Sequence, residues 1–325
     1  MHTSADLMAE TYGLGAGPWT VAPVTRGALG RIWKLTGNGT SWAVKELLFG
    51  CDEEQIRREA ALRQTAQDLG IASPRLLPNR DGGYVSHLTT SGGRSSVKLY
   101  EWIDGARADA SDPDVLDWFG RTMALLHTAG AGATGTPHDW YEKCPGEPDW
   151  KDLHTKVRQA GLPWADALGR FVATTAAELA RWVTPSGSGD RVTSHLDLQP
   201  QNVLVGPAGP VLLDWDNAGP TSAEREFARA VYVWSGGNDV DVDSARRLVL
   251  AYRNAGGRAV VRGPQSFSML FATDLNYVRV QAECAVDPTV SAEKRAFAGD
   301  QVVDTLRTLP DLTAVARLTA ALEDM

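Results

Sequence analysis

The chain has 325 residues, of which 43% are hydrophobic and 22% charged, so its composition is that of a globular protein and excludes a fibrous or largely disordered one. Its length favours two lobes over one compact core. The formal net charge of −8 argues against a nucleic-acid partner, because binding to phosphates needs a basic surface.

The three cysteines, Cys51, Cys144 and Cys284, are far apart and lack metal-binding spacing. An odd number without a framework favours a reducing compartment. The first ten residues have neither the basic flank nor the apolar core of a secretory signal. No apolar run approaches the roughly 20 residues that a membrane helix needs. The sequence therefore predicts a cytoplasmic protein without a membrane partner.

The first hundred residues predict strands and one long helix. The strands are expected over 19–24, 31–36, 41–48, 83–88 and 96–103. Asn38-Gly39 between two of them is a strong hairpin signal, because the tight turn needs positive φ. The helix is expected from Asp52, which can cap it, to Leu69, with Gly70 closing it. A turn at 91–94 joins the last two strands.

After Gly105 the pattern becomes helical. Helices are expected over 112–127, 171–183, 224–234, 244–254, 266–285 and 291–306. The prediction is an α+β protein. Its N-lobe, residues 1–104, holds a small antiparallel β-sheet and one main helix. Its C-lobe, residues 105–325, is larger and mostly helical.

The most informative stretch runs from Ser194 to Asp216. Asn202 opens one strand and Asp214 closes the next, so an antiparallel hairpin brings them together at its open end. Asp197 lies on the loop leading in. Oxygen ligands of this kind suit Mg²⁺, which leaves Asp197 to take a proton from an attacking hydroxyl. The alternative is an ordinary hairpin with an Asp/Asn-rich end.

Lys45 and Glu59 form a second pattern. Strand alternation places Lys45 on the face that carries Ala43 and Leu47. Glu59 falls inside an apolar helix stripe, where an acid should be paired, and Lys45 is its natural partner. Such a pair can aim the ammonium at nucleotide phosphates. The alternatives are a lysine at a strand edge and a glutamate at the margin of the stripe.

A turn between two expected strands contains Gly27 and Gly30, which would let backbone N–H groups approach phosphate oxygens. The alternative is a simple turn. What makes the set specific is its order: glycine-rich turn, strand Lys, helix Glu, H-x-D-x-x-x-x-N and a strand-ending Asp. This is the order of phosphoryl-transfer parts in protein kinases.

With these motifs the sequence resembles the aminoglycoside phosphotransferase family of the kinase-like bilobal fold, which also includes choline, homoserine and amino-sugar kinases. The resemblance runs from Val21 to Glu283 and is strongest at 195–216. It implies that Asp197 is the catalytic base and that Asn202 and Asp214 bind Mg²⁺.

The same resemblance implies that Lys45 contacts the α- and β-phosphates of ATP and is held by Glu59. Main-chain groups from Glu101 to Ile103, where the last N-lobe strand enters the hinge, would bind adenine. The chain departs from the family at Leu196, where Gly or Arg is frequent. It also has Trp-Asp after Asp214, and its glycine-rich turn is incomplete.

The acceptor is expected to be small, because the segment from Asp216 to the helix at Glu224 leaves no room for a long activation segment. Polar residues of the C-lobe are candidates for lining its cleft: Asp216, Glu224, Asp274, Asn276 and Glu283. Their acidity suits an amine-bearing substrate. The insert 136–164, with its three tryptophans, is expected to cover the cleft.

The sequence therefore predicts an ATP-dependent enzyme that phosphorylates a hydroxyl of a small molecule, such as an aminoglycoside-type or other amine-bearing antibiotic. The first alternative is a metabolite kinase for an amino sugar, choline or homoserine. The second is a catalytically inactive nucleotide-binding protein, disfavoured because Lys45, Asp197, Asn202 and Asp214 are all present. A protein kinase is disfavoured by the missing activation segment. The oligomeric state has no signal in the sequence.

Overall fold

The computed structural model describes residues 5–27, 30–48, 52–90, 93–323 and 325. They form two compact units. The first takes in Met1–Ala108 and Gln201–Ala218, and the second Asp109–Pro200 and Gly219–Met325. The first division of the chain, between Ala108 and Asp109, lies close to the expected boundary after residue 104. The hairpin segment 201–218, expected in the C-terminal part, belongs to the first unit.

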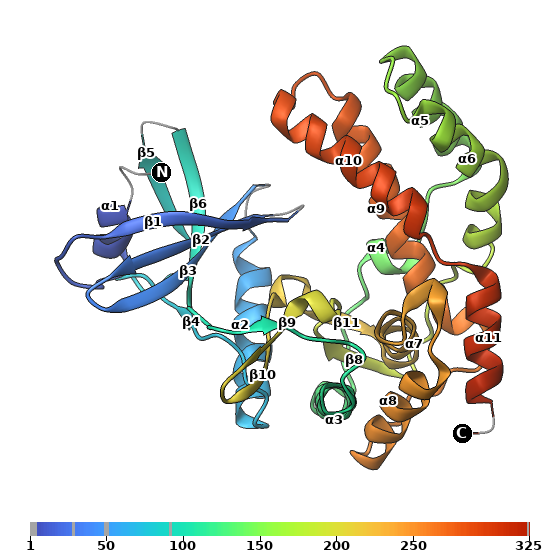
Figure 1. Cartoon of the computed structure of the whole chain (residues 1–325), viewed down its shortest axis with the longest axis horizontal. Coiled ribbons are helices and arrows are strands. Elements are labelled where there is room, and N and C mark those ends of the chain that lie inside the picture. The colour runs from blue at the N-terminus through green and yellow to red at the C-terminus, as the bar shows by residue number, and fades with distance from the viewer. Residues whose placement is uncertain (1–4, 28–29, 49–51, 91–92, 324) are drawn as a thin grey trace. The chain divides into compact units, whose positions relative to one another are not determined.

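The first unit is built on an antiparallel sheet, drawn in blue to cyan in Figure 1. Helix α1 (Ala5–Thr11) precedes the strands β1 (Thr20–Arg26), β2 (Gly30–Gly37), β3 (Thr40–Leu47), β4 (Leu76–Leu77), β5 (Ser86–Thr90) and β6 (Gly93–Glu101). Their order in the described part is β1-β2-β3-β6-β4, and β5 also pairs with β6. The predicted antiparallel sheet is confirmed, whereas α1 and β4 had no clear sequence signal. Residues 91 and 92 of the expected turn lie outside the described residues.

The β2–β3 hairpin confirms its sequence signal. Asn38 has φ 50° and Gly39 φ 72°, and Gly37 pairs with Thr40 on either side of them. Both central residues therefore adopt the left-handed conformation that a type I′ turn requires, which Asn and Gly tolerate best.

Helix α2 (Glu53–Asp68) begins as the sequence predicts. The side chain of Asp52 accepts hydrogen bonds from the backbone N–H groups of Glu54 and Gln55, at 2.9 and 3.3 Å. Gly70, with φ 79°, follows its end. The buried face carries Ile56, Glu59, Leu62, Arg63 and Ala66. Leu69, expected in this stripe, is 38% exposed because the helix has already ended.

The two faces of the sheet differ in chemistry. One face packs Leu35, Val44 and Leu99 into an apolar cluster with residues of α1. Alternation sends the neighbouring side chains to the opposite face, where Tyr100 packs with Ile56 of α2. This second face carries the lysines described below.

A second, three-stranded sheet completes the first unit. Its order is β10 (Gly209–Leu212), β9 (Val203–Gly206) and β7 (Ala106–Arg107). The predicted hairpin is present, and a short 3₁₀ turn η2 (Pro200–Asn202) leads into it. After β10 the backbone of Asp214 turns through φ 54° into η3 (Trp215–Asn217).

The second unit is mostly helical and is drawn in green to red in Figure 1. Its helices are α3 (Pro113–Ala129), α4 (Asp139–Glu142), α5 (Glu147–Gln159), α6 (Ala165–Ala180), α7 (Ala223–Trp234), α8 (Val242–Asn254), α9 (Ser268–Val286), α10 (Ala292–Thr308) and α11 (Leu312–Leu322). Short elements join them: β8 (Arg191–Ser194) paired with β11 (Gly219–Ser222), and the turns η4 (Gly237–Asp239) and η5 (Pro264–Phe267). Across the described residues, no helix has the length and apolar character to cross a membrane.

Six of these helices match the expected ones, with α6 beginning six residues before its expected start at 171. The helices α4, α5 and α11 were not predicted. Aromatic side chains stack in the core of this unit: Trp234 stacks on Phe119 at 4.1 Å between ring centroids, and Phe227 stacks on Tyr252 at 4.2 Å. These contacts join α3, α7 and α8.

Candidate active site

Lys45 of β3 contacts two carboxylates that follow the β9–β10 hairpin. Its Nζ lies 2.6 Å from Asp214 Oδ1 and 2.8 Å from Asp216 Oδ2. Burial by itself would lower the pKa of Lys45, but the two negative charges and their hydrogen bonds raise the pKa above its ordinary value. The lysine is thus a fixed cation. The side chain of Asp214 is 41% exposed, so it remains open to a ligand.

The glycine-rich turn lies directly beside this lysine. Gly27 N–H donates to the carbonyl of Gly30 at 2.9 Å, which closes the turn between β1 and β2. A Cβ atom on Gly30 would lie 3.2 Å from Lys45 Cε and 3.0 Å from the carbonyl oxygen of Glu46. Glycine therefore allows the turn to approach the lysine closely. Ala28 and Leu29, at its centre, lie outside the described residues.

Glu59 has a different partner from the one expected. Its Oε2 lies 2.7 Å from Nζ of Lys98, while its Oε1 accepts from Arg63 at 2.8 Å and from the Tyr100 hydroxyl at 3.0 Å. The prediction of a Lys45–Glu59 pair is wrong. The reason lies in the strand register, which places Lys98 of β6 directly opposite Lys45. A second lysine thus reaches the face that α2 covers.

Asp216 lies between the two lysines. Its Oδ1 is 2.6 Å from Nζ of Lys98, and its Oδ2 contacts Lys45. Burial would raise the pKa of Asp216, but the two ammonium groups hold it below its ordinary value. Gln55 of α2 donates to the carbonyl oxygens of Asp216 and Ala218 at 2.9 and 2.8 Å, and so fixes this segment. Asp216, expected to line the substrate cleft, takes part in this lysine cluster.

The open end of the hairpin brings Asn202 and Asp214 together, as predicted. Leu213 N–H donates to the carbonyl of Asn202 at 2.8 Å, and Asp214 is the residue that follows Leu213. Amide and carboxylate oxygens are hard donors of the kind that Mg²⁺ prefers. Within the described residues no cluster of three or more His, Cys, Asp or Glu residues could hold a metal ion.

The expected adenine-binding segment begins where β6 ends. Glu101 is the last residue of β6, and its N–H donates to the carbonyl of Arg75 at 2.9 Å. Ile103 follows in a stretch without regular secondary structure, residues 102–105. These residues lie where the chain leaves the large sheet, and their contact with adenine stays a prediction.

In the second unit, Asp197 is held by its own loop and by α7. Its N–H donates to Nδ1 of His195 at 3.2 Å. Its Oδ1 accepts from the side-chain amide of Gln199, and lies 3.3 Å from Nη2 of Arg229. Arg229 was not singled out from the sequence. The signal that could have found it is a single charged residue within the apolar run 227–234 of α7.

The residue before Asp197 is strained and firmly held. Leu196 has φ 63° and only 2% of its surface exposed. Its N–H donates to Oε1 of Glu226 at 2.7 Å, and its carbonyl accepts from Nη1 of Arg229 at 2.9 Å. Glu226 and Arg229 are three residues apart on α7, so one helix face holds both ends of this residue. In the family that the sequence resembles, Gly or Arg is frequent at this position. In this chain the position is occupied by leucine and has a left-handed backbone conformation.

His127 supports this arrangement from the end of α3. Its Nε2 lies 2.8 Å from Oε2 of Glu226, and its Nδ1 lies 2.8 Å from the hydroxyl of Tyr252. Burial would raise the pKa of Glu226, but its hydrogen bond with His127 and that residue's charge lower it. His127 is 5% exposed and therefore acts inside the core.

Three of the candidate substrate residues make hydrogen bonds or ion pairs within the second unit. Glu224 accepts from the Ser266 hydroxyl at 2.6 Å and pairs with Arg262. Asn276 donates to the carbonyl groups of residues 140 and 143, at 2.9 and 2.7 Å, and so ties α9 to α4. The side chain of Glu283 is half exposed and pairs with Arg279, one turn away, at 2.8 Å.

Asp274 differs from these candidates. It lies nine positions before Glu283, which places the two on opposite faces of α9, about 180° apart. Burial raises the pKa of Asp274 to about 6, against the opposing influence of the Arg229 charge. Its carboxylate therefore belongs to the surroundings of Arg229, which also contacts Asp197.

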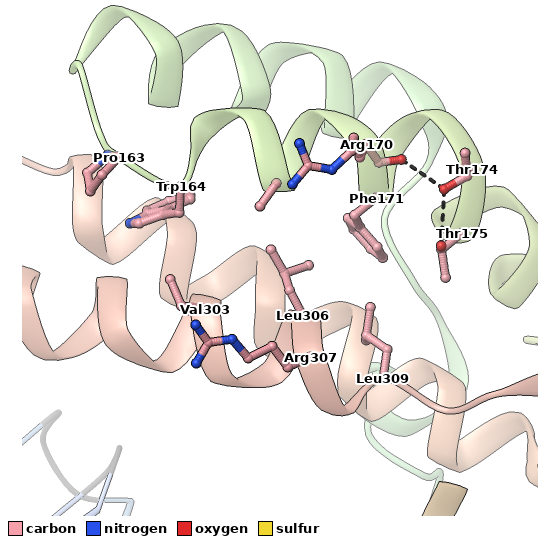
Figure 2. A pocket seen from close by; sticks show the side chains of 11 residues that line it. Pro163, Trp164, Arg170, Phe171, Thr174, Thr175, Val303, Leu306, Arg307 and Leu309 are labelled. Carbon is pink, nitrogen blue, oxygen red and sulfur yellow. Dashed lines mark hydrogen bonds between the residues drawn. The ribbon is translucent and has the colours of Figure 1, made fainter.

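The insert 136–164 contributes to two regions of the second unit. Trp140 packs against the buried cluster of Tyr141, Leu196 and Met269, next to the loop of Asp197. Trp164 lines a cavity of about 590 Å³ that runs between α6 and α10. Figure 2 shows Trp164 and Phe171 facing Leu306 across it. None of the predicted site residues lines this cavity.

Comparison with known proteins places these observations in a family. A family model described as the phosphotransferase enzyme family matches residues 20–264. No curated protein matches the chain in sequence.

Several solved structures share the fold. A spectinomycin phosphotransferase in complex with ADP and spectinomycin has a TM-score of 0.67 at 13% identity, with 98% of both chains covered. An amicoumacin kinase bound to AMP-PNP and Ca²⁺ has a TM-score of 0.59 at 14% identity, with 95% of this chain and 93% of that one covered. An aminoglycoside phosphotransferase from Alicyclobacillus acidocaldarius has a TM-score of 0.56 at 18% identity, with 97% of this chain and 95% of that one covered. The family match extends over most of the chain and includes both the lysine cluster and the loop of Asp197, so this chain belongs to the phosphotransferase enzyme family and has the kinase-like fold of small-molecule kinases.

Proposed function

We propose that this chain transfers the γ-phosphoryl group of ATP to a hydroxyl of an amine-bearing small molecule in the cytoplasm. One observation carries the proposal: the strand lysine Lys45 contacts Asp214, a residue 169 positions away that ends the hairpin, at 2.6 Å. A lysine and a hairpin-end aspartate placed together are two of the parts that phosphoryl transfer needs.

The nucleotide would be held within the first unit. Gly27 and Gly30 would shape a turn that the phosphates can approach closely, with Gly30 beside Lys45, whose fixed charge suits the α- and β-phosphates. Main-chain groups from Glu101 to Ile103 would bind adenine. The spectinomycin phosphotransferase and the amicoumacin kinase of the same fold were solved with ADP and AMP-PNP, which supports a nucleotide as the ligand.

Asn202 and Asp214 would hold Mg²⁺, which when bound would neutralise charge on the phosphates. Their oxygen donors fit this ion, and the exposed carboxylate of Asp214 is open to it. Lys45, now bound to Asp214 and Asp216, would then be available to the phosphates.

Asp197 would orient the acceptor hydroxyl and receive its proton. In this step the acceptor oxygen forms a bond to the γ-phosphorus, the bond between that phosphorus and the bridging oxygen of ADP breaks, and the proton moves to the Asp197 carboxylate. Gln199 and Arg229 fix this carboxylate, which makes its direction independent of the substrate.

The amine of the acceptor would be recognised by Asp274, the candidate substrate residue whose carboxylate lies near Arg229 and the loop of Asp197. The spectinomycin phosphotransferase of similar fold was solved with spectinomycin bound. An antibiotic is likewise the acceptor class that we propose for this chain. Phosphorylation would change its charge and shape and so confer resistance.

The test is a panel of aminoglycosides, other amine-bearing antibiotics, amino sugars, choline and homoserine, with ADP release and the mass of the product as readouts. The expected result is a mass gain of one phosphoryl group on an amine-bearing antibiotic. Asp197→Ala should lower turnover by about 10²–10⁴-fold while leaving AMP-PNP binding within a few-fold of wild type.

Three outcomes would contradict the proposal. Transfer only to an amino sugar, choline or homoserine would assign the chain to metabolism. Mg·ATP binding without any phosphorylated product would make it a non-catalytic nucleotide-binding protein. Undiminished turnover in Asp197→Ala would remove that residue from its role.

A further inference from the structure

Lys98 is a second lysine on the face that carries Lys45. The two residues are direct partners in the β3–β6 ladder, so their side chains leave adjacent strands on the same side. Only 2% of the Lys98 side chain is exposed. Two like charges side by side in a buried place repel each other, and they persist only where carboxylates lie between and around them.

Two carboxylates hold Lys98. Its Nζ lies 2.7 Å from Oε2 of Glu59 and 2.6 Å from Oδ1 of Asp216. The other oxygen of Asp216 contacts Lys45 at 2.8 Å. A single carboxylate therefore bridges the two lysines, one through each oxygen.

Among the described residues, Glu59 pairs with Lys98 and Arg63 and not with Lys45. Its Oε2 is used by Lys98, and its Oε1 accepts from Arg63 and from the Tyr100 hydroxyl. Glu59 therefore influences Lys45 only indirectly. It fixes Lys98, and Lys98 in turn fixes Asp216, which contacts Lys45.

Charges in the cluster balance. Lys45, Lys98 and Arg63 face the carboxylates of Glu59, Asp214 and Asp216. Asp214 is 41% exposed, whereas Asp216 is 18% exposed. If Asp214 turns to another ligand, Asp216 is the carboxylate that stays with Lys45, and Lys98 is the cation that keeps it there.

We propose that Lys98 is a positioning residue for the phosphate-binding lysine: it fixes Asp216, and Asp216 carries the role that the family resemblance assigns to Glu59. This inference rests on the proposed function, because it concerns the lysine that binds the nucleotide. The proposed site then contains two lysines. Lys45 binds the phosphates, and Lys98 fixes Asp216, which contacts Lys45.

The first experiment measures binding of AMP-PNP and of adenosine by calorimetry. The variant is Lys98→Met with Glu59→Gln, which removes one charge of each sign and leaves an acceptor for Arg63 and Tyr100. AMP-PNP affinity should fall about tenfold to hundredfold, the loss expected for a charged hydrogen bond. Adenosine affinity should stay unchanged, because adenosine has no phosphate for Lys45 to contact.

The matched control is Lys151→Met with Glu147→Gln, an exposed pair on α5 whose charged atoms lie 2.6 Å apart. It removes the same two charges and should leave both affinities unchanged. Equal weakening of AMP-PNP and adenosine by the Lys98 variant, or no weakening of either, would overturn the positioning role and leave Lys98 as a purely structural residue.

A second experiment tests whether Lys98 acts through Lys45. In a Lys45→Met background the Lys98→Met, Glu59→Gln change should cause no further loss of AMP-PNP affinity, because the side chain that it positions is gone. A full additional loss would show an effect independent of Lys45 and would overturn the proposal.

Single substitutions keep the proposal testable should the double variant fail to fold. Asp216→Asn should weaken AMP-PNP more than Glu59→Gln does, and Lys98→Arg should stay within a few-fold of wild type. The reverse order of the two acid variants would restore Glu59 as the anchor. Failure of the proposed function looks different: wild type would not bind AMP-PNP, or Lys45→Met would not weaken it.

Discussion

Asp274 illustrates what burial does to one residue. A carboxylate partly removed from water binds its proton more tightly, and the nearby charge of Arg229 offsets this only in part, so its pKa is raised to about 6. The folded protein then binds a proton there more tightly than the unfolded chain, whose Asp pKa is near 3.8. The group's contribution to stability is greatest at low pH and falls as pH rises through 6. A group that weakens the fold at neutral pH is a candidate for binding a cation.

Asp274→Asn should raise the KM for an amine-bearing acceptor about tenfold or more at pH 7.5, because a charged hydrogen bond is lost. In wild type the same KM should rise as pH falls below about 6, where the carboxylate becomes protonated. The variant should lack this pH dependence. Steady-state kinetics between pH 5.5 and 8 measure both effects, and an unchanged acceptor KM in the variant would exclude Asp274 from binding.

The same substitution should stabilise the fold. The shift of the pKa from 3.8 to about 6 corresponds to at most about 3 kcal/mol at pH 7.5 and to less at pH 5. Urea denaturation at the two pH values should therefore show a gain for Asp274→Asn that grows with pH. A gain of equal size at both would mean that the carboxylate is not the cause.

Helix α7 acts on the loop of Asp197 as one element. It presents Glu226 to the N–H of Leu196 and Arg229 to its carbonyl. A leucine held at φ 63° costs about 1–2 kcal/mol, and the surrounding contacts must supply this. The helix therefore fixes the backbone conformation that directs Asp197.

Glu226→Ala should lower the free energy of unfolding by about 3 kcal/mol or more, because Leu196 N–H and His127 lose a buried partner. Glu226→Gln keeps an acceptor for Leu196 and should cost less. The kcat should fall in the same order, since the strained loop relaxes. Urea denaturation and steady-state kinetics measure the two effects, with Glu178→Ala on the exposed side of α6 as the control. Equal losses for Ala and Gln would argue against the hydrogen bond to Leu196.

At the scale of the whole molecule, the proposed nucleotide site joins segments that are distant in the chain. Lys45, Glu59 and Lys98 come from the N-terminal part, while Asp214 and Asp216 follow the hairpin, and all five lie in the first unit. A ligand that binds only the assembled cluster stabilises the fold by mass action.

AMP-PNP with Mg²⁺ at about 100 times its Kd should stabilise the protein by about 2.7 kcal/mol, measured as a rise in Tm by calorimetry. EDTA should reduce the rise, because Asn202 and Asp214 are proposed to need the ion. Lys45→Met should reduce it with Mg²⁺ present. A rise that EDTA leaves unchanged would remove the metal from the proposed site.

Local signals in the sequence were sufficient for most elements. Asn38-Gly39 and the Asp52 cap work through backbone conformation and hydrogen bonds within a few residues, and the structure has the hairpin and the helix where they predict. The helix α4 has four residues and the strand β4 two, which is too short for any periodicity to be visible. The helices α5 and α11 were not predicted, although Pro148 lies in the first turn of α5 and Asp311 caps α11.

For the candidate site, the sequence by itself determined the residue types and their order: the glycine-rich turn, Lys45, Asp197, Asn202 and Asp214. The order of residues along the chain can be read without any knowledge of packing. The family match confirms the class of enzyme. Which acid pairs with which base was decided only by tertiary structure. Strand register set Lys98 opposite Lys45, and helix packing set Glu59 against Lys98, because charge pairing depends on distances between segments that the linear sequence does not contain.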